Sequence, residues 1–405
     1  MSLNSTPSSE RIHIGIFGRR NAGKSSLINM LTGQKLAIVS DVKGTTTDPV
    51  LKTMELLPLG PVVLIDTPGL DDIGELGKMR IQKAYQMLNK TDIAVLVADI
   101  SAGITEEDRK ILKKIEDKKI PYVVVWNKID RISETDLALH ILTDNPGIPK
   151  ERSICVSAKT GTHIHELKEL IAGLLPDEKG EHYLIRDLLS PLDLVVLVIP
   201  IDSSAPRGRL ILPQQQTIRD ILDAGAAAIA VKDTELKETL EKLGTLPRLV
   251  VTDSQVFKQV SAIVPTEIPL TSFSILFARY KGNLKTVTKG AAALDTLQNG
   301  DKILISEGCT HHRQCDDIGT VKLPKLVRKY SGKDVQFIFT GGTEFPDDLS
   351  PYKMVIHCGG CMLNEREMQY RLKCASDAGI PITNYGTAIA HMNGILNRSL
   401  EFFAL

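Results

Sequence analysis

Two groups of residues, one near each end of this 405-residue chain, have the types and the spacing that chemistry requires. The stretch from Gly18 to Ser25 reads GRRNAGKS and matches the pattern G-x-x-x-x-G-K-S, in which backbone N–H groups surround the phosphates of a nucleotide. The stretch HCGGC, from His357 to Cys361, carries two thiols at a spacing that suits soft metal ions. The sequence therefore predicts nucleotide chemistry and thiol chemistry on one polypeptide.

The phosphate-binding pattern follows a strand-like run, RIHIGIF, and precedes an apolar-periodic segment, which is the context that such a loop needs. Lys24 supplies a positive charge between the β- and γ-phosphates, and Ser25 offers a hydroxyl to Mg²⁺. We expect GTP to be contacted by Gly18, Asn21, Ala22, Gly23, Lys24, Ser25 and Ser26.

Three further motifs predict that the nucleotide is a guanine nucleotide. DTPG places the carboxylate of Asp66 beside Mg²⁺ and the amide of Gly69 beside the γ-phosphate. In NKID, Asp130 can accept both the N1 and the N2 hydrogens of guanine, which adenine cannot offer. The remaining residues of the base pocket come from NKID and from a third motif, SAK: Asn127, Lys128, Ser157, Ala158 and Lys159.

A candidate switch, KGTTTD, lies between the first two motifs at residues 43–48. Thr46 would complete the Mg²⁺ shell when the γ-phosphate is present, and such a loop orders with the triphosphate and relaxes after hydrolysis.

This part of the chain resembles the TrmE/Era/EngA group of GTPases. In that group a hydrophobic residue, here Leu70, follows DTPG where Ras-like proteins carry a glutamine. The resemblance implies slow hydrolysis stimulated by K⁺, with Asn21 as a ligand of the ion in the place that an arginine finger would fill. Lys24, Asn21 and Gly69 are the residues that we expect to act in hydrolysis.

The cysteine-bearing region combines two strand ends. Cys358 and Cys361 follow the strand-like run YKMVIH, and Cys309 follows DKILIS. Ligands of open α/β sheets sit beyond the carboxyl ends of the strands, so we expect these thiols to share one crevice. A helix beginning near Asn364 should lower the pKa of the thiols and favour thiolates.

Soft thiolates with candidate histidines leave two chemistries open, a structural zinc site and an iron–sulfur cluster. His311 and His357 are candidate ligands, although each can instead be a solvated or carbonyl-bonded histidine. Cys315 could be a spare ligand, whereas Cys155 and Cys374 are expected to be inert. Asn384 and Tyr385 follow the strand-like run IPIT and are expected to overhang the same crevice.

The order Cys309-Thr310-His311, a spacer of residues 312–356, and then HCGGC resembles the C-terminal pattern of the HydF family of FeFe-hydrogenase maturation GTPases. With the GTPase motifs in front, the resemblance covers the whole chain. It implies a scaffold that holds a 4Fe-4S cluster on the three cysteines with a non-cysteine or exchangeable fourth ligand. The implied cargo is a di-iron precursor, made by two radical S-adenosylmethionine maturases and delivered to apo-hydrogenase.

The elements that must position these residues follow a βαβ rhythm, which predicts an α/β fold with mostly parallel sheets. We expect three domains and one linker: a P-loop GTPase domain at 1–173, a linker at 174–190, a small dimerisation domain at 191–266 and a cluster-binding domain at 267–405. The dimerisation role, and hence a homodimer, comes from the resemblance.

Composition limits the possible partners. The chain has 49 basic and 49 acidic residues, so no global field draws it to nucleic acid or to an anionic membrane. With no spanning apolar run and no signal sequence at the start, we expect a cytoplasmic protein. Two other functions remain open: a ribosome-assembly or tRNA-modification GTPase with structural zinc, and a redox-sensing GTPase in which Cys358 and Cys361 form a reversible disulfide.

Overall fold

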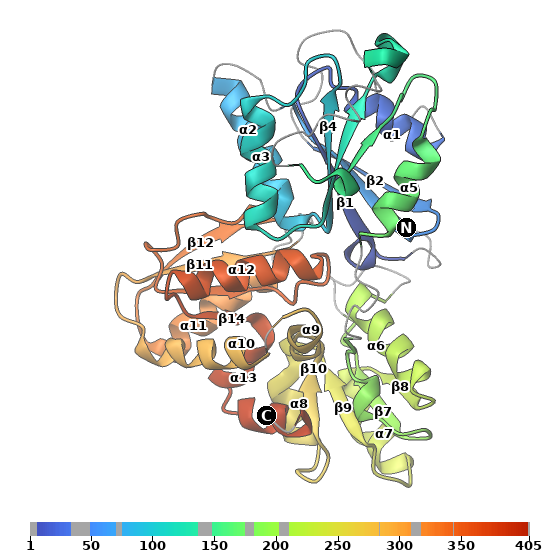
Figure 1. Cartoon of the computed structure of the whole chain (residues 1–405). Helices are drawn as coiled ribbons and strands as arrows, with labels where there is room; N and C mark the ends of the chain where they lie inside the picture. Colours follow the sequence, from blue (N-terminus) through green and yellow to red (C-terminus); the bar gives the residue numbers. More distant parts are fainter. Residues whose placement is uncertain are drawn as a thin grey trace. The chain divides into compact units, whose positions relative to one another are not determined.

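The computed structural model describes residues 6–33, 49–69, 75–136, 148–174, 182–201, 210–282, 284–308, 317–342 and 344–403. The chain forms two compact units, Met1–Lys179 and Gly180–Leu405 (Figure 1), and each is described by itself.

The first unit is built on a six-stranded sheet in the order β2-β3-β1-β4-β5-β6. All neighbouring strands are parallel except β2, which pairs antiparallel with β3. The strands are β1 (Ile12–Phe17), β2 (Val50–Leu56), β3 (Gly60–Asp66), β4 (Ile93–Asp99), β5 (Tyr122–Asn127) and β6 (Ser153–Cys155). The helices are α1 (Lys24–Thr32), α2 (Glu75–Met87), α3 (Glu106–Asp117) and α5 (Ile164–Ala172).

Helices cover both faces of this sheet. One core packs α1 and α5 against it, and a second core packs α2 and α3 against the opposite face (Figure 1). The central strands β4 and β5 are therefore buried on both sides, which explains their near-continuous apolar sequences. Because the parallel strands end at one edge of the sheet, the loops that follow β1, β3, β5 and β6 gather there.

The second unit contains two four-stranded parallel sheets. The first has the order β10-β9-β7-β8, and the second has the order β12-β11-β13-β14. The first is made of β7 (Leu194–Val198), β8 (Ala227–Val231), β9 (Leu249–Thr252) and β10 (Leu270–Ser272). The second is made of β11 (Lys302–Ser306), β12 (Gln336–Thr340), β13 (Met354–His357) and β14 (Ile382–Asn384).

One hydrophobic core joins the two sheets of this unit. Val196 and Val250 from the first sheet and Leu304 and Val355 from the second belong to the same buried cluster. The helices packed around the sheets are α6 (Leu212–Asp223), α7 (Leu236–Lys242), α8 (Phe257–Ile263), α9 (Phe273–Lys281), α10 (Leu284–Ala291), α11 (Leu323–Ser331), α12 (Glu365–Asp377), α13 (Tyr385–Met392) and α14 (Leu396–Leu400).

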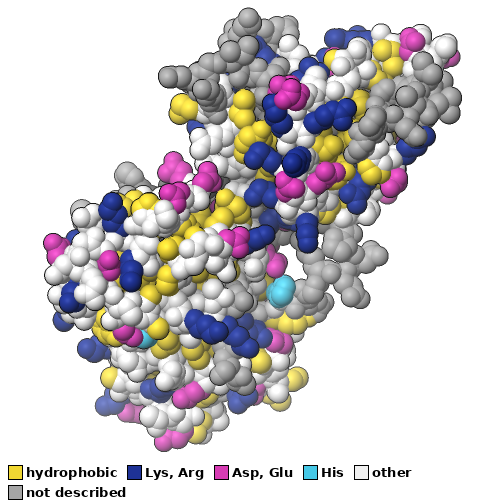
Figure 2. Space-filling model, turned by 60° about the vertical axis from the view of Figure 1, so that its left-hand side comes forward, with side chains coloured by type: hydrophobic (Ala, Val, Ile, Leu, Met, Phe, Trp, Pro, Cys, Tyr) yellow, Lys and Arg dark blue, Asp and Glu magenta, His cyan; other side chains and the backbone are white. Residues whose placement is uncertain are grey.

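The α/β class and the mostly parallel sheets are confirmed, and two strands differ from the prediction. Strands β2 and β10 were not predicted, because β2 alternates exposed and part-buried residues and β10 has only 3 residues. Within the described residues, no helix is both long enough and apolar enough to cross a membrane. Basic and acidic side chains are interspersed on the face shown in Figure 2.

Candidate functional site

The phosphate-binding loop begins where β1 ends and leads into α1. Gly18 and Gly23 have positive φ angles of 141° and 98°, and a side chain at either would collide with neighbouring atoms, the carbonyl of Val97 and the amide of Asn127 respectively. The Nζ atom of Lys24 donates to the carbonyl oxygens of Gly18 and Arg19, each at 2.9 Å. The lysine that should neutralise phosphate is thus buried inside the loop that bears it.

Asn127 connects three of the four guanine-nucleotide motifs. Its Nδ2 atom donates to the carbonyl of Ala22 at 3.0 Å, and its Oδ1 atom accepts from the amide of Ala158 at 3.0 Å. Asp130 accepts a hydrogen bond of 2.7 Å from the hydroxyl of Ser157, and Nζ of Lys159 lies 4.0 Å from its other oxygen. The base-recognition carboxylate is therefore held in place by the SAK segment.

Asp66 and Ser25 meet at the position expected of the Mg²⁺ ligands. The hydroxyl of Ser25 donates to Oδ2 of Asp66 at 3.2 Å. Burial raises the pKa of Asp66 above its ordinary value, against the opposing effects of Lys24, the Ser25 hydroxyl and Lys52. A carboxylate and a hydroxyl oxygen so placed are the hard ligands that Mg²⁺ prefers.

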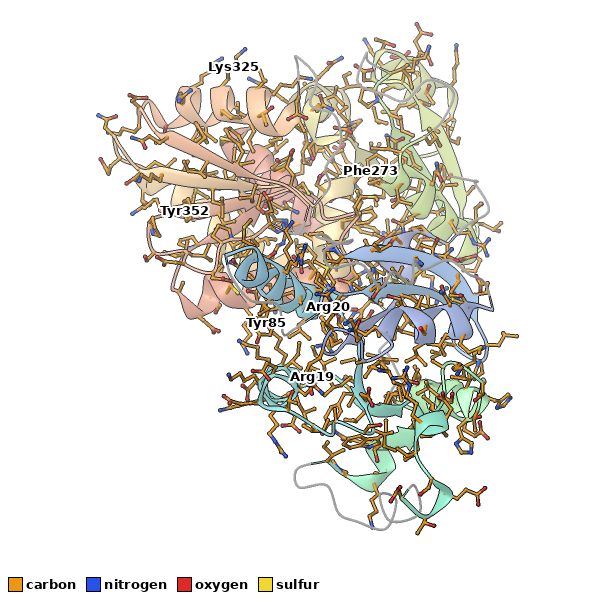
Figure 3. The ribbon with its side chains drawn as sticks, turned by 90° about the horizontal axis from the view of Figure 1, so that it is seen from above. Arg19, Arg20, Tyr85, Phe273, Lys325 and Tyr352 are labelled. Atoms are coloured by element: carbon orange, nitrogen blue, oxygen red, sulfur yellow. The ribbon has the colours of Figure 1, made fainter. Side chains whose placement is uncertain are left out.

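The loop carries two arginines that the sequence interpretation passed over (Figure 3). The Nε atom of Arg19 lies 3.3 Å from the carboxylate of Asp108, a fully buried residue in the first turn of α3. Arg20 packs against Gly69, where an added Cβ would lie 3.0 Å from the amide nitrogen of Arg20. Asn21 has a left-handed φ of 59°. The switch threonine Thr46 and the hydrophobic residue Leu70 lie outside the described residues.

The cysteine-bearing loop follows β13 and precedes α12. The Sγ atom of Cys358 accepts the amide hydrogens of Gly308, at 3.1 Å, and of Gly360, at 3.4 Å. Gly308 lies two residues after the end of β11 and directly precedes Cys309, so the segment that leads to Cys309 contacts the HCGGC loop. Backbone N–H donors to sulfur are the contacts that tune iron–sulfur ligands, and soft thiols with such donors fit a metal cluster.

The predicted lowering of the thiol pKa was wrong. Burial raises the pKa of Cys361 to about 11, and burial also raises the pKa of Cys358 despite its two N–H donors. Helix α12 begins at Glu365, with Asn364 as its N-cap. Its free amides therefore lie beyond the thiols and do not offset the loss of water around them.

His357 is buried at the end of β13. Its Nδ1 atom contacts the carbonyl oxygen of Cys358 at 2.5 Å, and its Nε2 atom has no hydrogen-bond partner. Burial lowers the pKa of His357 to about 4, so the imidazole is neutral at physiological pH. A neutral imidazole whose Nδ1 proton is donated to a carbonyl has a free lone pair on Nε2.

A carboxylate that the sequence interpretation missed lies on the same side of the sheet. Glu307 is buried, and its Oε1 atom accepts a hydrogen bond of 3.1 Å from the hydroxyl of Tyr385. Burial raises the pKa of Tyr385, and the nearby Cys358 and Glu307 act in the same direction. Asn384 instead caps α13 and donates to the carbonyl of Ser274 at 2.9 Å. Glu307 lies two residues before Cys309 at a strand end, and this position could have identified it as a candidate site residue.

The remaining predicted ligands, Cys309, His311 and Cys315, lie outside the described residues. Within the described part of the chain, no group of three or more His, Cys, Asp or Glu side chains could hold a metal ion. Cys155, in the first unit, and Cys374, on α12, are both half-buried, and neither is disulfide-bonded to a cysteine within the described residues.

Three family descriptions match consecutive parts of the chain. Residues 13–128 match the 50S ribosome-binding GTPase family, residues 184–282 match the hydrogen maturase F dimerization domain, and residues 285–402 match the hydrogen maturase F tetramerization domain.

Individual relatives match the GTPase portion. The GTPase Era of Pseudomonas aeruginosa is 35% identical over 183 residues, 44% of this chain and 58% of that protein. The GTPase Der of Clostridium perfringens is 32% identical over 199 residues, covering 44% of this chain and 45% of that protein. A solved structure of Aquifex aeolicus Era bound to GDP.AlF4- is 22% identical, with a TM-score of 0.37, over 54% of this chain and 92% of that chain. The chain thus spans about half the length of the curated relatives that it matches.

The four guanine-nucleotide motifs lie on the sheet edge that their order predicts, and the GTPase relatives share this part of the chain. The domain therefore binds GTP and Mg²⁺ and is a GTPase domain. Behind it, both C-terminal matches are to domains of a single kind of maturase, and their names indicate an oligomer. The chain belongs to the hydrogen maturase F family of GTPases.

Proposed function

We propose that this chain is a GTPase scaffold in the maturation of FeFe-hydrogenase. It holds a 4Fe-4S cluster, receives a di-iron precursor from two radical S-adenosylmethionine maturases, and delivers that precursor to apo-hydrogenase. The matches to both hydrogen maturase F domains support this role, because they cover most of the chain behind the GTPase domain. The GTPase relatives support only the GTPase part of the alternative role in ribosome assembly or tRNA modification.

The observation that carries the cluster proposal is the hydrogen bond from the amide of Gly308 to Sγ of Cys358. It brings the residue before Cys309 against the first cysteine of HCGGC, across fifty residues of sequence. Cys309, Cys358 and Cys361 are the thiol ligands that we assign. When bound, the cluster supplies an iron with an exchangeable position at which the precursor can attach.

The fourth ligand is a non-cysteine group in this proposal. Glu307 offers a buried carboxylate oxygen, and His357 offers the unpartnered Nε2 atom of a neutral imidazole. His311, two residues after Cys309, is a third candidate. The carboxylate exchanges more readily than a thiolate on iron because oxygen is the harder donor.

In this proposal, GTP hydrolysis by the GTPase domain sets the timing of partner release. Slow hydrolysis uses Lys24, the Gly69 amide, Mg²⁺ on Ser25 and Thr46, and a K⁺ ion beside Asn21. Asn21 has a left-handed backbone and an exposed side chain, and we place the K⁺ ion between its amide oxygen and the phosphate oxygens. An Asn21→Ala variant should lose the K⁺ stimulation of hydrolysis while keeping its affinity for GDP.

The domain assignments extend this proposal. We assign residues 1–173 to GTP binding, 174–190 to a linker, 191–266 to dimerisation and 267–405 to cluster binding, in a cytoplasmic homodimer.

Anaerobic purification followed by iron, sulfide and zinc analysis tests the proposal. Iron and sulfide near four per chain, with an electron paramagnetic resonance signal after reduction, are the expected result for the native chain. Cys358→Ala should lose both the iron and the signal. Cys374→Ala is the matched control, since this half-buried cysteine of the same unit lies on α12, outside the HCGGC loop, and its loss should leave the signal unchanged. Stoichiometric zinc without a signal would replace the proposal with a structural zinc site.

A further inference from the structure

The largest fully buried side chain in the described part of the structure is an arginine. Arg371, on α12, has an exposed fraction of 0%, and the side chain of its ion-pair partner Glu367 is 2% exposed. Burying such a pair carries a desolvation cost, and apolar residues of similar volume are often as stabilising. The stability of the core alone does not explain why this position carries a charge.

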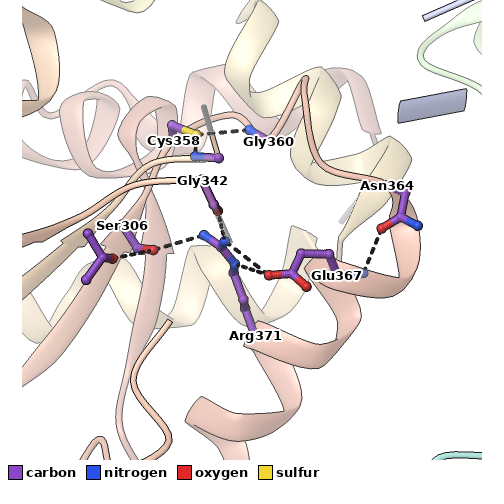
Figure 4. A network of polar contacts seen from close by, with 9 residues as sticks. Ser306, Gly342, Cys358, Gly360, Asn364, Glu367 and Arg371 are labelled. Carbon is purple, nitrogen blue, oxygen red and sulfur yellow. Dashed lines mark hydrogen bonds and ion pairs between the residues drawn. The ribbon is translucent and has the colours of Figure 1, made fainter. Parts of the chain in front are cut away.

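The contacts of Arg371 connect three segments of the chain (Figure 4). Its Nε and Nη2 atoms each lie 3.1 Å from Oε1 of Glu367, one turn earlier on α12. Its Nη1 atom donates to the hydroxyl of Ser306 at 2.9 Å, and Nη2 donates to the carbonyl of Gly342 at 2.6 Å. The planar guanidinium thus fastens α12 to the end of β11 and to the loop after β12.

Ser306 also contacts the cysteine-bearing loop. Its carbonyl oxygen accepts the amide hydrogen of Cys358 at 3.1 Å. The next residues of the β11 segment reach Gly308, whose amide donates to Sγ of Cys358. The buried cation therefore contacts the end of β11 directly, and the backbone of that strand end is in turn hydrogen-bonded to Cys358 at the end of β13.

A second buried cation approaches the other cysteine from α9. Lys281 is 3% exposed, and its Nζ atom donates to the carbonyl oxygen of Leu363 at 2.9 Å and lies 3.5 Å from that of Cys361. Burial raises the pKa of both thiols, and Lys281 opposes this effect at Cys361 while Arg371 opposes it at Cys358, where Glu307 acts against Arg371. Because both cations are buried, salt screens these interactions little.

We propose that Arg371 and Lys281 are positioning residues of the cluster site, two fixed cations that hold the cysteine-bearing loop and raise the reduction potential of the cluster. This inference rests on the proposed 4Fe-4S cluster. Reduction adds one electron from an external donor to the cluster and makes it more negative. A fixed positive charge nearby stabilises the reduced form more than the oxidised form, and local charge and hydrogen bonds are what set such potentials.

The test is a redox titration of the reconstituted full-length chain, poised with mediators and dithionite and followed by electron paramagnetic resonance. Arg371→Met and Lys281→Met should each retain the cluster and shift its midpoint potential to a more negative value. Lys373→Met is the matched control, because this exposed lysine lies on the same helix and its loss changes the net charge equally. It should leave the potential unchanged.

Arg371→Lys separates charge from positioning. It keeps the cation but cannot reproduce the fork to Glu367, Ser306 and Gly342, so it should restore most of the potential while loosening the loop. The loosening is measured by amide hydrogen exchange of segments 303–308 and 355–364, which should speed up in Arg371→Lys and stay native in Lys373→Met.

The outcomes distinguish this inference from the proposed function. If Arg371→Met and Lys281→Met hold the cluster and show the native midpoint potential, the claim that the two cations raise the potential is wrong. If Arg371→Met fails to fold, Lys281→Met still tests the effect of charge on the midpoint potential, and Arg371→Lys still tests the positioning of the loop. If the native chain takes up no iron and sulfide, the proposed function fails instead. Hydrogen exchange in the cluster-free chain then still tests positioning, and unchanged rates in Arg371→Lys would reject it.

Discussion

At the scale of single residues, the nucleotide site depends on side chains that serve two motifs at once. Asn127 bridges the phosphate-binding loop and the SAK segment, and Ser157 orients the carboxylate of Asp130. Each such hydrogen bond holds a side chain in place before the nucleotide binds, so ordering that side chain on binding costs less free energy.

Asp130 should carry the guanine selectivity. Replacing it by alanine removes two hydrogen bonds from the base to a charged group, each contributing about 1.5–3 kcal/mol. Asp130→Ala should therefore weaken GTP binding by at least about a hundredfold, since the two bonds together contribute about 3 kcal/mol or more and each 1.4 kcal/mol corresponds to a factor of ten. Titration with a fluorescent GTP analogue measures this loss. Asp136→Ala, an exposed carboxylate six residues further on, is the control and should bind like the native chain.

Tyr385 should hold the carboxylate of Glu307 at the cysteine-bearing loop. Tyr385→Phe removes the 3.1 Å hydrogen bond to Glu307 without changing the buried ring. If this carboxylate is a ligand, the variant should lose iron faster during dilution and show an altered paramagnetic spectrum. Tyr330→Phe removes a similar tyrosine–aspartate bond at the surface and should change neither property. Identical spectra and iron retention in the two variants would exclude Tyr385 from the site.

At the scale of elements, close contacts between backbones determine which helices can sit beside the sheets. Gly290 of α10 faces the carbonyl of Ile382 on β14 so closely that no side chain fits between them. Gly290→Ala should lower the free energy of unfolding by about 1–3 kcal/mol through overpacking. Urea unfolding followed by circular dichroism measures this. Gly173→Ala, where an added Cβ meets only ordinary contacts, should unfold like the native chain.

A surface cluster links three elements of the second unit. Asp295 accepts hydrogen bonds from Tyr330 of α11 at 2.7 Å and from His391 of α13 at 3.0 Å. The Tyr330 hydroxyl and then His391 lower the pKa of Asp295 below its ordinary value of 3.8. The carboxylate therefore contributes stability above pH 3.8, which is lost as the pH falls through the lower pKa of the folded state.

Asp295→Asn should reveal this contribution. After allowance for solvent screening at an exposed site, the loss at pH 7 should be about 0.5–1 kcal/mol. Urea titrations at pH 7 and at pH 3 would compare the variant with the native chain. The difference between the two chains should shrink at pH 3, where protonation begins to remove the same charge from the native chain. A constant difference would show that the charge of Asp295 is not responsible.

At the scale of the whole molecule, the second unit combines two sheets around one shared core. Residues 180–405 should therefore fold without the GTPase unit, and they carry both domains whose names indicate oligomers. Light scattering after size exclusion should find 180–405 oligomeric and 1–179 monomeric. An oligomeric 1–179 fragment would place the association surface in the GTPase unit.

Local sequence was sufficient for much of the GTPase domain. Its motifs have fixed spacings, and each follows a buried apolar strand, so both the parallel sheet and the edge that carries the site could be predicted. The same is true of HCGGC, which follows the buried run of β13. Strand β2 was missed because its exposed edge position removes the continuous apolar signal.

Only the tertiary structure decided the environment of the thiols. A helix near HCGGC predicted a lowered thiol pKa, but burial outweighs the N–H donors because desolvation depends on everything packed around the sulfur atoms. Glu307 and Lys281 come from segments far from HCGGC in the sequence, so the sequence alone could not predict that they lie close to it.

Arg371 shows both what the sequence can predict and what requires the tertiary structure. The helical period of α12 places it beside Met368 and Leu372 on the buried face, and this much could be read from the chain. Its partners Ser306 and Gly342 become neighbours only when β11, β12 and α12 pack together. Sequence by itself determined the GTPase motifs and the residue types of the cysteine-bearing loop, because residue types and short spacings are local. The tertiary structure decided which charges surround them, because burial and Coulomb interactions depend on distances in space.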